Sequence, residues 1–184
     1  MSEVLPGEVR QIGYVVTDLD EAISGWLRMG VGPWFVIRNL PQRVRYRGDP
    51  CEVKLSLALS NSGDLQVELI QQLDDTPSIF TEFLAGAPAG GFHQLAYWTA
   101  DFDKAMAKLA EAGWPLVWSG GEAEGVRFAY FEPPTGAAIV ESRCANPPAA
   151  WAPMYGNRLS PGTAVTRSGN WAADRGVVTY ACLR

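Results

Sequence analysis

Hydrophobic and polar residues alternate at the start of the chain in a way that predicts a strand followed by a helix. Residues 9–16 form a β-branched and aromatic run, and Thr17-Asp18 after it is a typical helix N-cap. Apolar residues then recur at helical spacing over residues 19–29, and Gly30 marks the end of that helix. Three more strands are predicted in this block, at residues 34–40, 52–59 and 65–71, the last two joined by a turn at 61–64.

The second half of the chain repeats this order of elements. A strand at residues 92–99 precedes Ala100-Asp101 and a helix at 102–112. Three strands follow, at residues 115–119, 126–131 and 137–142. Between the halves, residues 74–90 contain Pro77, Pro88 and a short apolar patch, which predicts a linker with one or two helical turns.

The two halves are also similar in sequence. QIGYVVTDLDEAISGWLRMG, which begins at Gln11, aligns without a gap with QLAYWTADFDKAMAKLAEAG, which begins at Gln94. The closing segments LQVELIQ and AAIVESR carry Glu68 and Glu141 at matching places. The chain is therefore predicted to be a tandem repeat, and a site between its halves would contain two glutamines and two glutamates.

We expect an α+β fold of two β-α-β-β-β modules, with the first module at residues 1–73, a linker at 74–90 and the second module at 91–144. Residues 145–184 are rich in proline, glycine and arginine and belong to neither repeat. For this irregular C-terminal extension three alternatives stay open: it wraps a partner subunit, it is loose in solution, or it is an unusual end of the reading frame.

Composition narrows the class of protein. A hydrophobic content of 47% is enough for a sizeable core, whereas a net charge of -5 without a basic stripe argues against nucleic acid as a partner. No apolar run reaches the roughly 20 residues of a membrane span, and the first residues do not resemble an export signal. Three widely spaced cysteines fit reduced thiols. We expect a cytoplasmic protein without a membrane or nucleic-acid partner.

A single histidine, His93, limits the possible chemistry. Three-histidine zinc sites and two-histidine iron sites need more imidazoles than one chain supplies, and no GxSxG motif accompanies His93. Strand alternation places Gln94 on one face with Ala96 and Trp98, and His93 on the other. If Gln94 faces a cavity, His93 is predicted to point away from it, and its replacement is predicted to leave the chemistry unchanged.

Glu68 and Glu141 each lie within an apolar strand. An ionised carboxylate buried there costs several kcal/mol unless a cation or hydrogen bonds compensate. Each glutamate alone is explained by a strand end that reaches water or an arginine such as Arg127 or Arg143. Their equivalent positions, together with the two glutamines, favour a shared site instead.

The segments that open the two modules, at Gln11 and Gln94, and those that close them, around Glu68 and Glu141, resemble the vicinal oxygen chelate superfamily. This superfamily includes glyoxalases, methylmalonyl-CoA epimerases, extradiol dioxygenases and bleomycin-resistance proteins. The resemblance covers about residues 9–143 and implies that the modules form a cupped mixed sheet around a central cavity. It also implies that the first and last strands of each module supply metal ligands, which here are Gln11, Glu68, Gln94 and Glu141.

The chain departs from this pattern where metal-using members usually carry histidine, at Gln94 and often at Gln11. Amide and carboxylate oxygens suit Mg²⁺, Mn²⁺ or Ca²⁺ better than zinc or iron, which argues against extradiol cleavage. The expectation is either one divalent metal (Mg, Mn, Co or Zn) or none.

Two functions follow from the resemblance. The first is an isomerase, epimerase or lyase in which Glu68 and Glu141 act as general acid and base on a carbonyl-containing, apolar or aromatic small molecule or an acyl thioester, through an enolate. The alternative is a metal-free protein that binds or sequesters a small molecule. We favour the enzyme, and we expect a homodimer.

Aromatic residues on the predicted strands suggest a wall for an apolar substrate. They are Trp34, Trp98, Trp118, Phe128 and Tyr130; the alternative is that most of them pack the helices against the sheet. Arg38, Arg43, Arg45 and Arg47 are candidates for binding the phosphates of a coenzyme A thioester, although a solvated loop explains them equally well.

Overall fold

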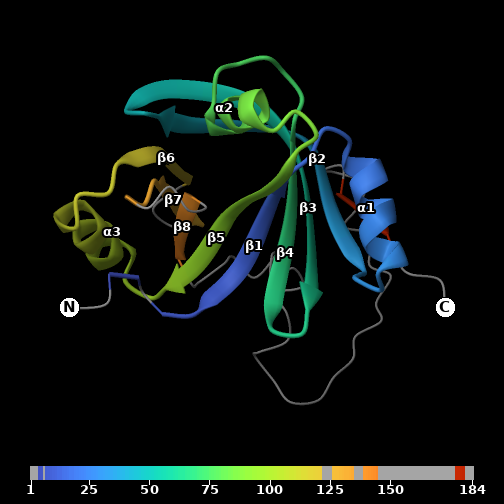
Figure 1. Cartoon of the computed structure of the whole chain (residues 1–184), viewed down its shortest axis with the longest axis horizontal. Helices are drawn as coiled ribbons and strands as arrows, with labels where there is room; N and C mark the ends of the chain where they lie inside the picture. The colour runs from blue at the N-terminus through green and yellow to red at the C-terminus, as the bar shows by residue number, and fades with distance from the viewer. Residues whose placement is uncertain (1–3, 6, 122–125, 135–138, 145–176, 181–184) are drawn as a thin grey trace.

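The computed structural model describes residues 4–5, 7–121, 126–134, 139–144 and 177–180. Its strands form one curled mixed sheet in the order β3-β4-β1-β5-β8-β7-β6-β2-β9 (Figure 1). In chain order the elements are β1 (Val9–Val15), α1 (Leu19–Arg28), β2 (Trp34–Tyr46), β3 (Asp49–Ser62), β4 (Leu65–Gln72), α2 (Ile79–Gly86), β5 (Gly91–Thr99), α3 (Phe102–Glu111), β6 (Leu116–Gly121), β7 (Arg127–Phe131), β8 (Ile139–Cys144) and β9 (Val177–Tyr180).

The order of elements confirms the expected α+β fold of two β-α-β-β-β modules. Strands β1 to β4 with α1 form one module, and β5 to β8 with α3 form the other. The first and last strands of each module run parallel, and β1 pairs antiparallel with β5 to join the modules. The two copies therefore share one continuous sheet with a pseudo-twofold relation at the β1–β5 pair.

Each long helix covers the convex face of its own module. Leu19 and Ile23 of α1 pack on β2 to β4, and Leu109 of α3 packs on β7. Both helices begin in the same way, because the side chains of Asp18 and Asp101 accept backbone hydrogen bonds three residues on, at 2.9 and 3.0 Å. The repeated aspartate is thus an N-cap in both copies.

Strand β2 is longer than the predicted strand at 34–40 and closes the sheet. It pairs with β3 from Phe35 to Tyr46 and bends at a register shift that includes Asn39, whose φ is 53°. Beyond the bend, Val44 to Tyr46 also pair with β6 of the second module. The sheet therefore curls until its two modules meet through one strand.

The C-terminal extension contributes at least one strand to this sheet. β9 pairs antiparallel with residues Trp34 to Ile37 at the start of β2. The other residues of the extension lie outside the described part of the chain. Among the described residues, no helix has both the length and the apolar character needed to cross a membrane.

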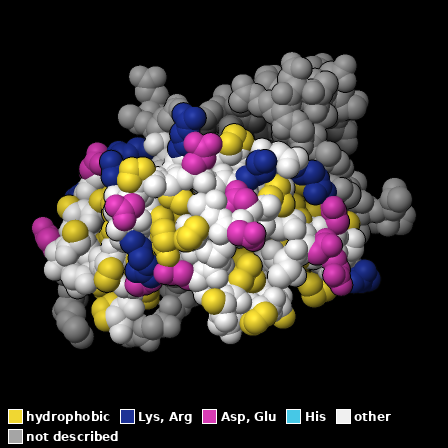
Figure 2. Space-filling model, turned by 90° about the horizontal axis from the view of Figure 1, so that it is seen from above, with side chains coloured by type: hydrophobic (Ala, Val, Ile, Leu, Met, Phe, Trp, Pro, Cys, Tyr) yellow, Lys and Arg dark blue, Asp and Glu magenta, His cyan; other side chains and the backbone are white. Residues whose placement is uncertain are grey.

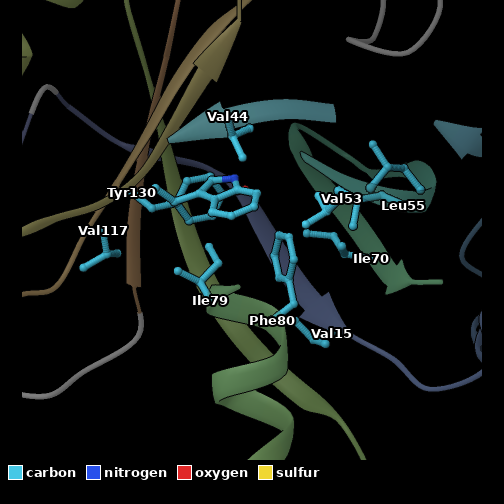
Figure 3. Close-up of a cluster of buried hydrophobic side chains, with 11 residues drawn as sticks. Val15, Val44, Val53, Leu55, Ile70, Ile79, Phe80, Val117 and Tyr130 are labelled. Carbon is cyan, nitrogen blue, oxygen red and sulfur yellow. The ribbon is translucent and has the colours of Figure 1, made fainter. Parts of the chain in front are cut away.

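The segment predicted to be a linker is part of the core. Helix α2 begins with a capping box in which Ser78 and Thr81 bond to each other's backbone N–H. Its first residues, Ile79 and Phe80, are buried between the modules and face Tyr130 of β7 (Figure 3). The sequence predicted the helical turn but not that it fills the concave side of the sheet.

Charged groups fasten α2 in this position. The guanidinium of Arg47, at the tip of the β2–β3 hairpin, lies 2.9 Å from Glu82 of α2 and 2.8 Å from Glu132, which follows β7. The Tyr46 hydroxyl also bonds to Glu82. Seen from the hairpin side, acidic and basic side chains are interspersed over the surface (Figure 2). We call Arg47, Glu82 and Glu132 the hairpin clamp.

The hairpin clamp is expected to make the free energy of unfolding depend on pH. The hydrogen bonds from Arg47 hold the pKa of Glu82 below its ordinary value of 4.5. A carboxylate with a lowered pKa adds stability that is present above the ordinary pKa and is lost as the pH falls through the folded value. Because these side chains are half exposed, Glu82→Gln is expected to cost about 0.5–1 kcal/mol of unfolding free energy at about pH 7.

Urea denaturation at several pH values checks this expectation. The difference between the parent protein and Glu82→Gln should shrink as the pH falls below 4.5 and vanish below the lowered pKa of Glu82. Glu111→Gln, on the exposed side of α3, is the matched control and should be near neutral throughout. A difference that does not change with pH would show that ionised Glu82 does not fasten α2.

Candidate active site

A small cavity of about 30 Å³ lies on the concave side of the sheet. It has room for about two water molecules. Strands from both modules and α2 form its wall. The lining residues are the polar Gln42, Glu68 and Tyr130 and the apolar or aromatic Leu55, Leu57, Ile70, Phe80, Trp118 and Phe128.

Glu68 of β4 is a buried carboxylate in this wall, with 2% of its surface exposed. The side-chain amide of Gln94, on β5, lies with its Nε2 at 3.4 Å from Glu68 Oε2. The same Nε2 lies 3.0 Å from the Tyr130 hydroxyl. Gln94 is itself fully buried. The structure therefore joins three of the predicted site residues in one hydrogen-bonded group, which we call the Glu68–Gln94–Tyr130 group.

This group depends on Gly13 of β1, the strand between β4 and β5. In the sheet register Gly13 is the partner of both Glu68 and Gln94. A Cβ atom at Gly13 would lie 2.4 Å from Gln94 Cδ. The Gln94 side chain thus passes over β1 at a residue that has no side chain, and in this way it reaches a carboxylate two strands away.

The equivalent glutamine of the first module behaves differently. Gln11 faces Ala96, whose methyl group stands where Gly13 has none. The Gln11 Nε2 donates instead to Gln66 Oε1 on the neighbouring strand, at 2.6 Å. Its buried Oε1 has no hydrogen-bond partner among the described residues. The repeat is symmetric in sequence, whereas these two amides are arranged asymmetrically.

The backbone of Glu141 occupies the place that the repeat predicts. On β8 it is the register partner of Ala96 and Tyr130, as Glu68 is of Gly13. Its side chain lies outside the described part of the structure. A shared site of Glu68 and Glu141 therefore stays a prediction.

The prediction that strand alternation places His93 and Gln94 on opposite faces is wrong. Gly13 and Tyr14 are consecutive on β1 but pair with Gln94 and Phe92, so His93 is the extra residue of a β-bulge. The bulge breaks strict alternation, and the His93 Nδ1 contacts the Gln94 Oε1. No local sequence signal marks this bulge.

His93 is 3% exposed and packs against Phe80 and Tyr130, which line the cavity. Its ring lies 5.1 Å from the Phe83 ring and 5.6 Å from the Phe80 ring, centre to centre. Burial lowers the pKa of His93, and the contact with Gln94 opposes this only in part. The buried Nε2 of His93 has no hydrogen-bond partner among the described residues. The ring is therefore neutral at about pH 7 and carries a single N–H.

Three of the five predicted aromatic wall residues, Trp118, Phe128 and Tyr130, line the cavity. Trp34 lies beneath α1 instead, and its Nε1 donates to the Val31 carbonyl at 2.9 Å. The Arg10 guanidinium lies over the Trp98 ring, with its Cζ 5.5 Å from the ring centre. Phe80 was not among the predicted wall residues because it lies in the predicted linker. The capping box formed by Ser78 and Thr81 is a sequence signal for the start of the helix that contains it.

The four arginines considered for phosphate binding lie on the β2–β3 hairpin and have acceptors within the protein. Arg38 bonds to Asp20, Arg43 to Glu52 at 2.9 Å and Arg45 to a backbone carbonyl at 2.8 Å, while Arg47 belongs to the hairpin clamp. These contacts support a structural role for the four side chains in the described arrangement.

Comparisons with known proteins identify the family. A model of the Glyoxalase/Bleomycin resistance protein/Dioxygenase superfamily matches residues 10–130. The chain belongs to this superfamily. A comparison with curated proteins finds no match.

Solved structures agree in fold. Methylmalonyl-CoA epimerase from Mycobacterium tuberculosis is 22% identical, with a TM-score of 0.55 over 83% of this chain and 97% of its own. A hypothetical protein from Bacillus halodurans is 16% identical, with a TM-score of 0.55 over 77% of this chain and 96% of its own. A variant of the Streptomyces coelicolor epimerase, in complex with 2-nitronate-propionyl-CoA, is 20% identical, with a TM-score of 0.52 over 74% of this chain and 92% of its own. At this identity the likeness establishes the fold alone.

Members of the superfamily often bind a divalent metal, so the donor atoms must be tested for fit. Within the described residues no cluster of three or more histidine, cysteine, aspartate and glutamate side chains is present. Gln94 presents its Nε2, a hydrogen-bond donor, to Glu68, and Gln11 is bonded to Gln66. The described arrangement does not fit a metal ion shared by Gln94 and Glu68, because an amide ligates through its oxygen.

A substitution at Phe80 tests whether its side chain occupies the space beside Glu68. Phe80→Ala would open space beside Glu68 and is expected to lower the free energy of unfolding by about 3–5 kcal/mol, because the packed core relaxes only in part. Phe92→Ala is the matched control, since Phe92 is 42% exposed, and should cost less than about 1.5 kcal/mol. Urea denaturation compares the two, and equal costs would show that Phe80 does not fill the cavity.

Proposed function

We propose that this protein is an isomerase or epimerase of the glyoxalase fold that removes and returns a proton next to a carbonyl group, with Glu68 as the general base. The observation that carries the proposal is the buried Glu68 carboxylate, which lines the cavity and lies against the Gln94 amide. A buried carboxylate is costly to keep, and a reaction that needs a base in an apolar site explains its retention.

The proposed step is proton transfer from the carbon next to the carbonyl. The Glu68 carboxylate accepts the proton, the C–H electron pair forms a carbon–carbon double bond, and the π pair of the carbonyl moves onto its oxygen to give an enolate. Protonation of the same carbon from the opposite face yields the epimer, and protonation of a neighbouring atom yields an isomer. Glu141 is proposed to supply that second proton, because its backbone pairs with Ala96 as the backbone of Glu68 pairs with Gly13, at the equivalent position of the repeat.

The enolate oxygen needs hydrogen-bond donors, and Trp118 offers one. Its side chain lines the cavity, and its buried Nε1 has no acceptor among the described residues. An unsatisfied buried N–H costs about 1–3 kcal/mol, which a bound carbonyl oxygen would recover. Donors placed in a dry site stabilise developing negative charge more than donors in water do.

The cavity volume limits how a substrate enters. A volume of about 30 Å³ is far below the roughly 300 Å³ of small-molecule sites, so binding requires side chains to move. Phe80 and Ile79 are the proposed movable wall, because they come from a short helix rather than from the sheet. The substrate class proposed is an apolar or aromatic carbonyl compound or an acyl thioester.

Deuterium exchange tests the reaction even while the product is unidentified. The purified protein is incubated in ²H₂O with acyl thioesters and aromatic ketones, and incorporation next to the carbonyl is followed by NMR. Parent protein is expected to catalyse exchange with at least one class. Glu68→Gln should slow it by about 10²–10⁴-fold, because an amide keeps the volume but cannot accept the proton.

Glu111→Gln is the control for the change of carboxylate to amide and should exchange at the parent rate. An unchanged rate in Glu68→Gln would remove Glu68 as the base. Absence of exchange across the whole panel, with the fold intact by circular dichroism, would count against the proposed chemistry itself.

A second candidate is a protein that binds a ligand without turnover. The observation that favours it is the aromatic wall of Phe80, Trp118 and Phe128 beside the buried carboxylate of Glu68, which suits a cationic or hydroxylated apolar ligand. Calorimetric titration with such ligands separates the two functions. Tight binding that Glu68→Gln abolishes, without any exchange reaction, would favour the binding protein.

A further inference from the structure

We propose that His93 is a positioning residue that fixes the orientation of the Gln94 amide and makes Gln94 a hydrogen-bond donor to Glu68 rather than a metal ligand. This inference rests on the proposed function only in treating Glu68 as the base. The geometry of His93 and Gln94 is independent of any reaction.

The orientation of the Gln94 amide follows from its neighbours. A carboxylate oxygen accepts hydrogen bonds, and the group of the Gln94 amide that faces Glu68 is its N–H₂ group. Nε2 lies 3.4 Å from Glu68 Oε2 and 3.0 Å from the Tyr130 oxygen. The carbonyl of the same amide must then point the other way, and there Oε1 meets His93 Nδ1.

The tautomer of His93 follows in turn. A carbonyl oxygen accepts a hydrogen bond, so the His93 Nδ1 that faces it must carry the proton. The β-bulge is what brings this nitrogen to Gln94, because a regular strand would turn the two side chains to opposite faces. The ring is held in place by Phe80 and Phe83.

The two tautomers have opposite consequences for the site. With Nδ1–H, the Gln94 carbonyl is occupied and its N–H₂ faces the carboxylate. With Nδ1 bare, the amide would rotate, and its oxygen would face Glu68 Oε2. Two oxygens that face each other repel unless a cation lies between them. The tautomer of His93 therefore determines whether Glu68 accepts a hydrogen bond from Gln94 or forms a cation site with the Gln94 oxygen.

The single histidine of the chain makes this testable by NMR. Protein labelled with ¹⁵N-histidine gives one pair of ring nitrogen signals, and protonated and bare nitrogens differ in chemical shift. The expected result is Nδ1 protonated and Nε2 bare, unchanged when Mg²⁺ or Zn²⁺ is added. A bare Nδ1, or a change of tautomer on addition of either metal, would overturn the proposal.

Two matched variants test whether the contact with Gln94 determines the tautomer of His93. Gln94→Leu removes the acceptor and should shift the His93 signals, whereas Gln11→Leu changes the equivalent glutamine of the other module and should leave them unchanged. A His93 spectrum identical in parent and Gln94→Leu protein would contradict the proposed contact. None of these measurements requires turnover, so their failure is distinct from failure of the proposed reaction.

A kinetic readout applies once an exchanging substrate is known. His93→Asn keeps an N–H donor near the Gln94 carbonyl and should retain most of kcat. His93→Leu removes the donor and should lower kcat by about 10- to 100-fold with little change in KM, because the base is misaligned. Equal rates in the two variants would show that the donor has no positioning role.

Discussion

The site depends on the absence of a side chain at Gly13. Glu68 and Gln94 lie on strands that are not neighbours, and β1 runs between them. The amide reaches the carboxylate only because it passes over Gly13, where a Cβ atom would lie 2.4 Å from Gln94 Cδ. A buried carboxylate without such a donor would carry a larger desolvation cost. The absence of a side chain at Gly13 therefore allows a buried carboxyl group of the first module to bond to an amide of the second.

The rest of the fold shields this group from bulk water. The sheet curls until β2 meets β6, and α2 fills the concave side with Ile79 and Phe80. The hairpin clamp holds α2 from the outside through groups that are half exposed to water. Packing shields Glu68 from bulk water, and this shielding strengthens each hydrogen bond around it. The same packing leaves little space for a ligand, so the proposed reaction places opposing demands on α2, which must both exclude bulk water and admit a substrate.

The duplication was sufficient to predict the fold, because hydrophobic periodicity and the N-caps Asp18 and Asp101 recur in both halves. It also brought attention to Glu68 and Gln94, which the structure places in contact. It did not predict the consequence of Ala96 standing where the first copy has Gly13, or the β-bulge at His93, whose counterpart in β1 is the register shift at Arg10. The methyl group of Ala96 faces Gln11 where Gly13 faces Gln94, and the bulge at His93 defeats a parity argument that assumes a regular strand. Such features depend on how two strands pair, and no local pattern within one strand reports them.

The central claim, that Gln94 reaches across β1 to Glu68, is tested most directly by a double-mutant cycle. The free energy of unfolding is measured for the parent protein, Glu68→Met, Gln94→Met and the double variant, since methionine keeps the chain length without polar atoms. A hydrogen bond to a buried charged group predicts a coupling energy of about 1.5–3 kcal/mol between the two positions. Additive effects, within about 0.5 kcal/mol, would contradict the account and show that the two side chains do not interact.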